Sequence, residues 1–307
     1  MTTEHNSQAR SGVLFALAAY SMWGFAPLYF KLLTFIPAPE ILVQRVVWSM
    51  VVLILLVVVL KQWPSIQRAL RSKKVMLTLF IAGGLLAANW LLFIWAVNND
   101  HLLEASLGYY INPLLNMLFG RLFLAERVRP LQKVAVVLAL SGVVVAVIGL
   151  GYLPWIALVL AMSFSLYGLL RKTVGVDSIP GLFIETFMML PVVLAYWFWF
   201  AGDASNLLTN DSTTNILLLA GGVITTAPLL CFTAAARRIR YTTLGFFQYI
   251  GPSIMFVLAV FYYHEPLHQA RLITFVFVWT ALAIFCWDSF RHYVQQRRQS
   301  KDALASP

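Results

Sequence analysis

Three of the charged residues inside long apolar runs of the sequence are candidates for function: Arg45, Glu104 and Glu185. A charge within a membrane span costs roughly 2.5 to 3.5 kcal/mol on insertion scales, so each suggests a coupling or gating role. Glu104 could exchange a proton; the alternative is an interfacial carboxylate near His101. Arg45 could attract an anionic or carbonyl-bearing solute, or form a structural ion pair with Glu40 or Glu104. Glu185 could bind a solute or a proton, or make a fixed contact to a neighbouring helix end.

Polar, aromatic and proline residues away from the ends of the apolar runs are candidates for a binding cavity. Amides and hydroxyls can bind a solute, and inner aromatic rings provide flat apolar walls with polar edges. Proline kinks a helix and leaves a carbonyl that cavity water can satisfy. The alternatives are hydrogen bonds that join helices, packing against lipid and passive kinks. The predicted lining residues are Trp23, Asn89, Trp90, Tyr110, Asn112, Pro113, Thr225, Gln248, Tyr249 and Pro252.

No catalytic residue, metal site or cofactor site is predicted. The sequence lacks a G-x-x-x-x-G-K-[ST] phosphate loop, a G-x-S-x-G motif and a C-x-x-C motif. Without a nucleotide site, the energy for moving a solute must come from a gradient, or there is no coupling at all.

The elements that must position these residues are membrane-spanning helices. About 20 apolar residues cross a bilayer as a helix, and the chain contains ten such stretches. A composition of 61% hydrophobic and 11% charged residues excludes an ordinary soluble domain. The predicted spans are 13–33, 41–60, 75–97, 102–123, 134–150, 153–170, 181–200, 216–236, 241–263 and 272–290.

Basic residues fall almost entirely in every second joint between these spans. One side holds clusters such as Arg68 to Lys74 and Arg237 to Arg240, whereas the other side holds only Lys31 and Arg271. By the positive-inside rule, both termini are cytoplasmic and the number of spans is even. The net charge of +10 then matches an anionic cytoplasmic leaflet and does not indicate nucleic-acid binding.

The two halves of the chain resemble each other. With a shift of 139 residues, Tyr110, Ile111, Pro113 and Glu126 meet Tyr249, Ile250, Pro252 and Glu265. With a shift of 138, Gly83 and Gly84 meet Gly221 and Gly222. Five spans per unit would insert the second unit upside down. Inverted repeats of this kind are typical of transporters that bind solute near the midplane.

The same residues carry a resemblance to a known family. The segments NWLLFIWAVN (89–98), LEASLGYYINPL (103–114), FLAER (123–127), IET (184–186), PLLCFTAAA (228–236) and TLGFFQYIGP (243–252) resemble the RarD branch of the EamA, drug/metabolite transporter superfamily. The likeness covers about residues 10 to 290. It implies ten transmembrane helices, two EamA repeats, a bacterial inner membrane and a permease role, but it assigns no substrate.

The predicted fold is an all-α integral membrane protein with ten transmembrane helices in two inverted five-helix repeats. The repeats occupy 13–150 and 151–290, between a cytoplasmic tail at 1–12 and a basic cytoplasmic tail at 291–307. The predicted location is the bacterial inner membrane, with a multi-pass chain. Its partners are a small-molecule substrate and the lipid bilayer, and a homodimer is compatible with the sequence.

The predicted function is a secondary transporter that moves small amphipathic metabolites or drugs by alternating access. The outward direction of transport rests on the resemblance alone. Transport could be coupled to protons, or it could be facilitated diffusion without coupling. The alternatives are a membrane enzyme acting on lipid-linked substrates and a non-transporting receptor or scaffold. An enzyme would need an acid and a nucleophile at one interface, and the carboxylates do not cluster in that way.

Overall fold

The computed structural model of the chain describes residues 2–98, 101–150, 153–200, 202, 206–262 and 269–305, apart from some side chains that include that of Glu104. The described residues form helices and connecting turns without a strand. The helices are α1 (Thr2–Lys31), α2 (Ala38–Val59), α3 (Trp63–Leu70), α4 (Lys73–Asn98), α5 (Leu102–Phe123), α6 (Pro130–Leu150), α7 (Trp155–Thr173), α8 (Ser178–Phe200), α9 (Ser212–Arg238), α10 (Tyr241–Phe247), α11 (Ile250–Val257), the π-helix η2 (Leu258–Tyr262) and α12 (Gln269–Ala305).

Eight segments of the described chain are helical, long and apolar enough to cross a membrane. A shorter apolar segment, Pro130–Val145, belongs to α6. Helices suit this setting because a helix satisfies its own backbone hydrogen bonds where lipid offers none. The helices α5 and α6 occupy two further predicted spans, so the fold is a helical membrane bundle and the count of ten stays a prediction.

Three features of the helices add to the sequence-based prediction. The predicted tails are helical in their described parts, because α1 begins at Thr2 and α12 ends at Ala305. The joint after α2 contains the short helix α3, whose first turn holds a proline. The predicted span 241–263 is interrupted between α10 and α11.

Pro252 gives the interruption a physical cause. A proline has no N–H to donate to the carbonyl four residues earlier and its ring collides with that carbonyl. For Pro252 that carbonyl belongs to Gln248, and Gln248 is the C-cap that directly follows α10. The corresponding Pro113 lies inside α5, which remains one helix.

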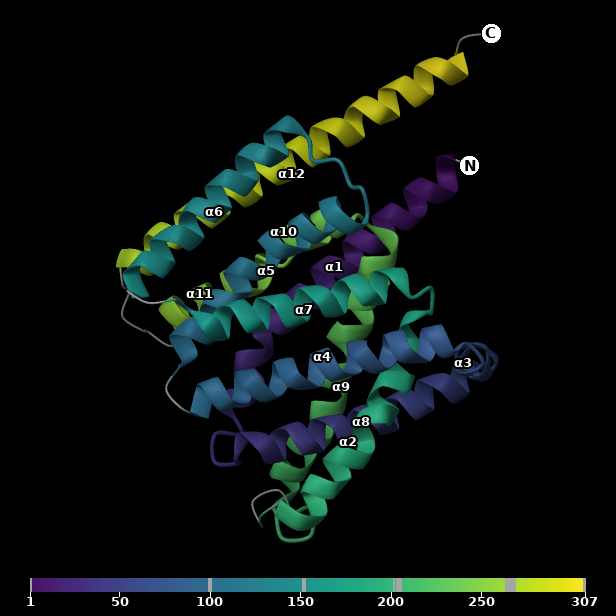
Figure 1. The fold of residues 1–307 in the computed structure, drawn as a ribbon, viewed down its shortest axis with the longest axis vertical. Helices are drawn as coiled ribbons and strands as arrows, with labels where there is room; N and C mark the ends of the chain where they lie inside the picture. The colour runs from purple at the N-terminus through teal and green to yellow at the C-terminus, as the bar shows by residue number, and fades with distance from the viewer. Residues whose placement is uncertain are drawn as a thin grey trace.

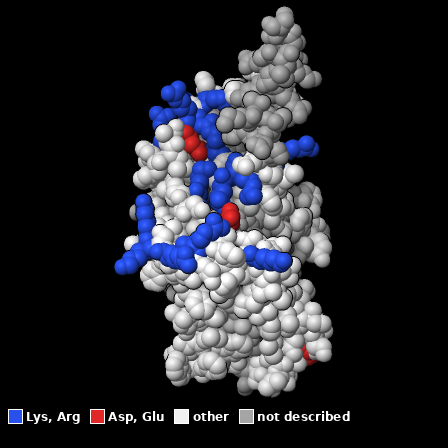
Figure 2. Space-filling view, turned by 90° about the vertical axis from the view of Figure 1, so that its right-hand side faces the viewer, with Lys and Arg blue, Asp and Glu red and all other residues white. Residues whose placement is uncertain are grey.

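The helices lie side by side in an elongated bundle (Figure 1). At one end α6 runs along α12, and at the other end α2 packs against α8 (Figure 1). Between them α7 contacts both α4 and α5, and α9 contacts α1 and α2. The start of α1 and the end of α12 point to the same side of the molecule (Figure 1). Lys and Arg side chains gather on that side, which we call the basic face (Figure 2).

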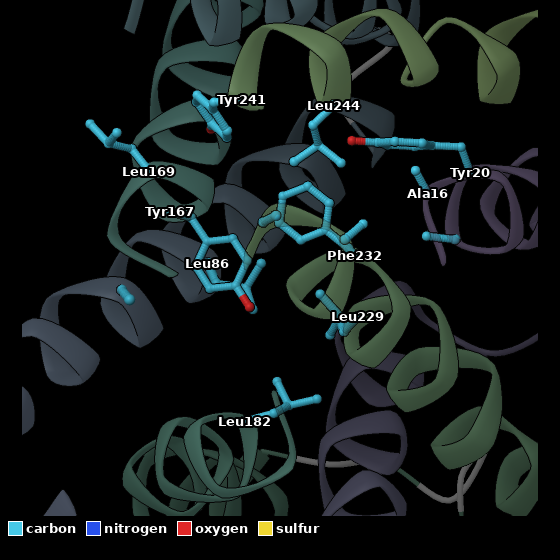
Figure 3. Close-up of a cluster of buried hydrophobic side chains, with 14 of the residues drawn as sticks. Ala16, Tyr20, Leu86, Tyr167, Leu169, Leu182, Leu229, Phe232, Tyr241 and Leu244 are labelled. Atoms are coloured by element: carbon cyan, nitrogen blue, oxygen red, sulfur yellow. The ribbon is translucent and has the colours of Figure 1, made fainter. Parts of the chain in front are cut away.

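The largest buried cluster joins α1, α7, α9 and α10 through aromatic rings (Figure 3). Phe232 lies at its centre, edge-on to Tyr20 at 6.3 Å and stacked on Tyr167 at 6.0 Å between ring centroids. Leu182 of α8 and Leu229 of α9 extend the cluster toward the cavity described next (Figure 3).

Candidate solute-binding cavity

An internal cavity lies between α2, α4, α8 and α9. The lining residues are Val46 and Ser49 of α2, Leu86 and Trp90 of α4, Leu182, Glu185, Thr186 and Met189 of α8, and Thr225, Thr226 and Leu229 of α9. The space open to the centre of a water molecule is about 10 Å³. That is room for about one water, so the cavity is nearly closed in this conformation.

Three of the predicted site residues line this cavity together: Trp90, Thr225 and Glu185. A fourth, Arg45, contacts two of its walls. The Arg45 Nε donates a hydrogen bond of 2.7 Å to Thr225 Oγ1. Its guanidinium carbon lies 5.5 Å from the centroid of the Trp90 ring and 5.1 Å from that of Phe30. Both distances fit a cation–π contact.

Glu185 is paired inside the protein with Arg171 of α7. Their side chains are 1% and 0% exposed, and Arg171 Nε lies 3.5 Å from Glu185 Oε1. Tyr167 donates a hydrogen bond of 3.4 Å to the other carboxylate oxygen. These contacts are long, and Glu185 Oε1 and two Arg171 nitrogens have no hydrogen-bond partner in the described structure. The pair is therefore buried but loosely held.

Glycines allow this pair to be buried. A Cβ placed at Gly181 would lie 2.0 Å from Arg171 Nη1, so the guanidinium would have to move if this residue carried a side chain. A Cβ added at Gly83 of α4 would lie 3.6 Å from Glu185 Cβ, which is an ordinary contact distance. Close approach of helices at small residues is a usual device in membrane bundles.

Four predicted lining residues lie instead where α5 meets its neighbours. Ser165 of α7 donates a hydrogen bond of 2.7 Å to the buried Asn112 Oδ1. Gln248 Oε1 accepts one of 3.0 Å from Asn116. Tyr249 donates one of 3.3 Å to the carbonyl of Tyr110, whose ring packs against Phe275. These groups join helices in this conformation, which was the alternative reading for such side chains.

The remaining lining candidates are spread over the bundle. Trp23 packs against Phe164 and Phe232 in the aromatic cluster. Asn89 donates hydrogen bonds of 2.8 Å to Ser163 Oγ and to the Leu160 carbonyl. The prolines 113 and 252 lie in α5 and α11.

The acidic partners considered for Arg45 lie elsewhere or outside the described side chains. Glu40 accepts a hydrogen bond of 3.1 Å from the Gly202 N–H. Glu104 lies in the first turn of α5, and its side chain is not among those described. Within the described part of the chain, the ion pairs are formed by other cations.

The prediction of no metal site overlooked one motif. His264, Glu265 and His268 have the H-E-x-x-H spacing that binds zinc when it lies on one helix. Pro266 stands inside the motif, and 263–268 lie outside the described residues. The described residues contain no group of three His, Cys, Asp or Glu that could hold a metal.

Sequence reasoning also missed contacts made by charged residues that had served only to predict the orientation in the membrane. Arg171 belongs to the buried pair, although its position beside Lys172 suggested a solvated joint. Lys172 Nζ donates a hydrogen bond of 2.8 Å to the Ala236 carbonyl at the end of α9. Glu126 accepts hydrogen bonds of 2.6 and 2.8 Å from the N–H groups of Tyr241 and Thr242. The repeat match of Glu126 with Glu265 was the available signal for this last contact.

Comparison with known proteins supports the resemblance found in the sequence. Residues 10–148 match the EamA-like transporter family. A protein named RarD from Salmonella typhi is 51% identical over 292 residues, which cover 95% of this chain and 99% of that protein. A Vibrio cholerae protein named as an uncharacterized transporter is 49% identical, covering 94% of this chain and 96% of that protein.

A solved crystal structure of another protein shares the fold. Its TM-score is 0.69 at 17% sequence identity, and the match covers 92% of this chain and 98% of that one. The full-length similarity to RarD proteins and the helical membrane fold lead to one conclusion. The chain belongs to the RarD family of EamA-like membrane transporters.

Proposed function

We propose that the protein is a secondary transporter of small amphipathic organic solutes that works by alternating access. The observation that carries the proposal is the cavity between α2 and α4 of the first half and α8 and α9 of the second. A site between two halves can open to either side as they rock. The halves are the repeats proposed at 13–150 and 151–290.

The pairing of helices supports an inverted repeat. A pseudo-twofold axis that exchanges the halves would relate the α1 and α9 contact to the α7 and α4 contact. It would also relate the contact of α5 with α7 to the contact of α11 with α1. Three further contacts would each map onto themselves: α2 with α8, α5 with α10, and α6 with α12. Tyr110 and Tyr249 are equivalent positions, and they contact each other as residues near such an axis would.

The small size of the cavity fits one step of such a cycle. Pockets that bind small organic molecules measure roughly 300 to 1,000 Å³. The space of about 10 Å³ must therefore expand before a solute enters. The proposed setting is the bacterial inner membrane with the basic face in the cytoplasm, and the proposed direction is export, which rests on family resemblance.

Glu185 is the proposed coupling residue. Glu185 lines the cavity. Its contact with Arg171 is 3.5 Å long, so the carboxylate could give up this partner for a proton. Binding of a proton to the carboxylate would release Arg171 and change the contact between α7 and α8. Glu104 remains a second proposed coupling residue at the start of α5.

Transport in sealed proteoliposomes tests the proposal. Uptake of unmodified radiolabelled solutes is expected, with a rate that depends on an imposed pH gradient. Glu185→Gln should weaken the pH dependence more than it weakens solute binding, because glutamine keeps the shape and loses the titration. Glu104→Gln is measured in parallel. Chemical conversion of the solutes would favour the membrane enzyme, and absence of any movement would favour a receptor or scaffold.

A further inference from the structure

Arg45 is a cation inside a membrane span whose surroundings are aromatic and hydroxylic. It lies near the start of the candidate span Pro39–Val59, between the rings of Phe30 and Trp90. A charge in this place is costly, so a compensating role is expected.

The described hydrogen bond of Arg45 engages the Nε of the guanidinium. Its Nε donates to Thr225, and within the described structure the two Nη groups make no hydrogen bond. The Nη edge presents parallel N–H groups that match the two oxygens of a carboxylate. Gly221 keeps α9 close to this group, because a Cβ there would lie 3.1 Å from Arg45 Cγ and 2.7 Å from Tyr29 Oη.

The arginine is continuous with the cavity. Trp90 and Thr225 each contact Arg45 and each line the cavity. Apolar side chains such as Val46 and Leu229 follow along its wall. A solute that meets all these groups has an anionic head and an apolar body.

We propose that Arg45 binds the carboxylate of the transported solute, whose apolar body lies against Trp90 in the opened cavity. This assignment rests on the proposed transport function and narrows the substrate class to small organic monocarboxylates. The other charge at the cavity does not favour a cationic solute. Glu185 already faces Arg171, so an organic cation would have to displace an internal partner, whereas the Nη groups of Arg45 make no hydrogen bond to a described residue.

Matched pairs of acid and amide test the assignment on the purified full-length protein. The probes are phenylacetate and phenylacetamide, benzoate and benzamide, and 4-methylpentanoate and 4-methylpentanamide, at constant ionic strength. Ligands that bind the folded state raise the thermal unfolding temperature, which yields an apparent Kd. At least one acid is expected to bind about ten-fold more tightly than its amide, as a charge-assisted hydrogen-bond pair would require.

Variants distinguish binding of the acids by Arg45 from attraction of the acids to the positive charge of the protein as a whole. Arg45→Gln should bring the acid and the amide within about two-fold of each other, and Arg45→Lys should keep only part of the preference because lysine lacks the planar fork. Lys31→Gln removes an exposed cation at the end of α1 and should keep the full preference. Yield and a monodisperse elution profile establish that each variant is folded.

Three results would overturn the assignment: no acid binds, acids and amides bind alike, or the preference survives Arg45→Gln. Proteoliposome flux of neutral solutes keeps this failure distinct from failure of the proposed function. If neutral solutes are transported and the acids neither bind nor compete, the transport function is supported and the proposed role of Arg45 is rejected. If no solute of any charge crosses, the transport proposal itself falls.

Discussion

Arg171 and Glu185 form a charge pair from which solvent is excluded, since their side chains are 0% and 1% exposed. Removing both charges from water costs several kcal/mol per ion, and good geometry is needed to recover that cost. Here the separation is 3.5 Å and several polar atoms lack a partner in the described structure. A pair of this kind contributes little to net stability, and the coupling role proposed for Glu185 is the reason we suggest for its presence.

Charge-pair replacement tests this view of the two residues. Arg171→Met leaves a carboxyl group that must stay buried without its partner or take up a proton, and both outcomes are costly. We expect the free energy of unfolding to fall by about 3 to 5 kcal/mol. Adding Glu185→Met should recover most of the loss, because no uncompensated charge remains. Thermal unfolding in detergent provides the measurement.

The surface pair of Arg237 with Asp177 supplies a matched control. Both side chains are partly exposed, at 29% and 64%, so Arg237→Met should change stability by only about 0 to 1 kcal/mol. A double variant of Arg171 and Glu185 that is no more stable than Arg171→Met alone would contradict the expected coupling.

At the residue scale, sequence reasoning singled out residue types that are unusual for their surroundings. Glu185 and Arg45 stood out because charges are rare in apolar runs, and both lie at or beside the cavity. Arg171 did not stand out, because an arginine at the end of a span is expected in a cytoplasmic joint. Its guanidinium packs against Gly181 of another helix, and no local pattern carries that information.

At the scale of elements, the two repeat-related prolines differ in their effect on the helix. The sequence placed both midway through a span, but only the segment around Pro252 is divided into α10, α11 and the π-helix η2. α5 remains continuous across Pro113. Packing against neighbours decides whether a missing hydrogen bond bends a helix or divides it, so this outcome was not predictable from the position alone.

Replacing these prolines should separate transport from stability. Pro252→Ala restores an N–H that can donate to Gln248, so α10 and α11 gain continuity. We expect unchanged or raised thermal stability together with a lower transport rate, because the interruption lies in the proposed moving interface. Pro113→Ala should lower transport less, since α5 is already continuous. Equal transport by the wild type and both variants would assign the prolines to passive packing.

Close contact between α2 and α9 depends on Gly222. A Cβ at this position would lie 2.5 Å from the backbone carbon of Trp48, so the helices would have to separate. Gly222→Ala should therefore lower the free energy of unfolding by about 1 to 3 kcal/mol. Gly84 matches Gly222 in the repeat comparison of neighbouring glycines, but no atom lies within 4 Å of its added Cβ. Gly84→Ala should be neutral or stabilising by up to about 1 kcal/mol.

Thermal unfolding of the two glycine variants in the same detergent distinguishes these expectations. Equal stability of both variants would mean that α2 and α9 can separate without cost. The comparison is informative because both substitutions add the same methyl group inside a long helix.

At the scale of the whole molecule, contacts on the basic face join the two halves. Arg129 lies 2.9 Å from Asp288 of α12, and Glu126 accepts hydrogen bonds from the first residues of α10. Arg240 also donates to the carbonyl of Arg127. The halves are therefore tied together on the face where Lys and Arg gather (Figure 2). If the proposed repeats move apart on this face, these contacts must break.

The orientation of that face in the membrane is the remaining prediction. Basic joints stay on the cytoplasmic side because translocating their charges is unfavourable. We therefore expect Ser72, in the joint before α4, to be cytoplasmic, and Thr209, in the joint before α9, to be external. Single cysteines at these positions, Ser72→Cys and Thr209→Cys, are introduced after Cys231→Ser and Cys286→Ser remove the native thiols. An impermeant maleimide should label intact cells carrying Thr209→Cys and should label Ser72→Cys only after the membrane is permeabilised. Labelling of Ser72→Cys in intact cells would show that the basic face lies outside the cell. The contacts of Glu126 and Arg129 would then close the external side of the protein.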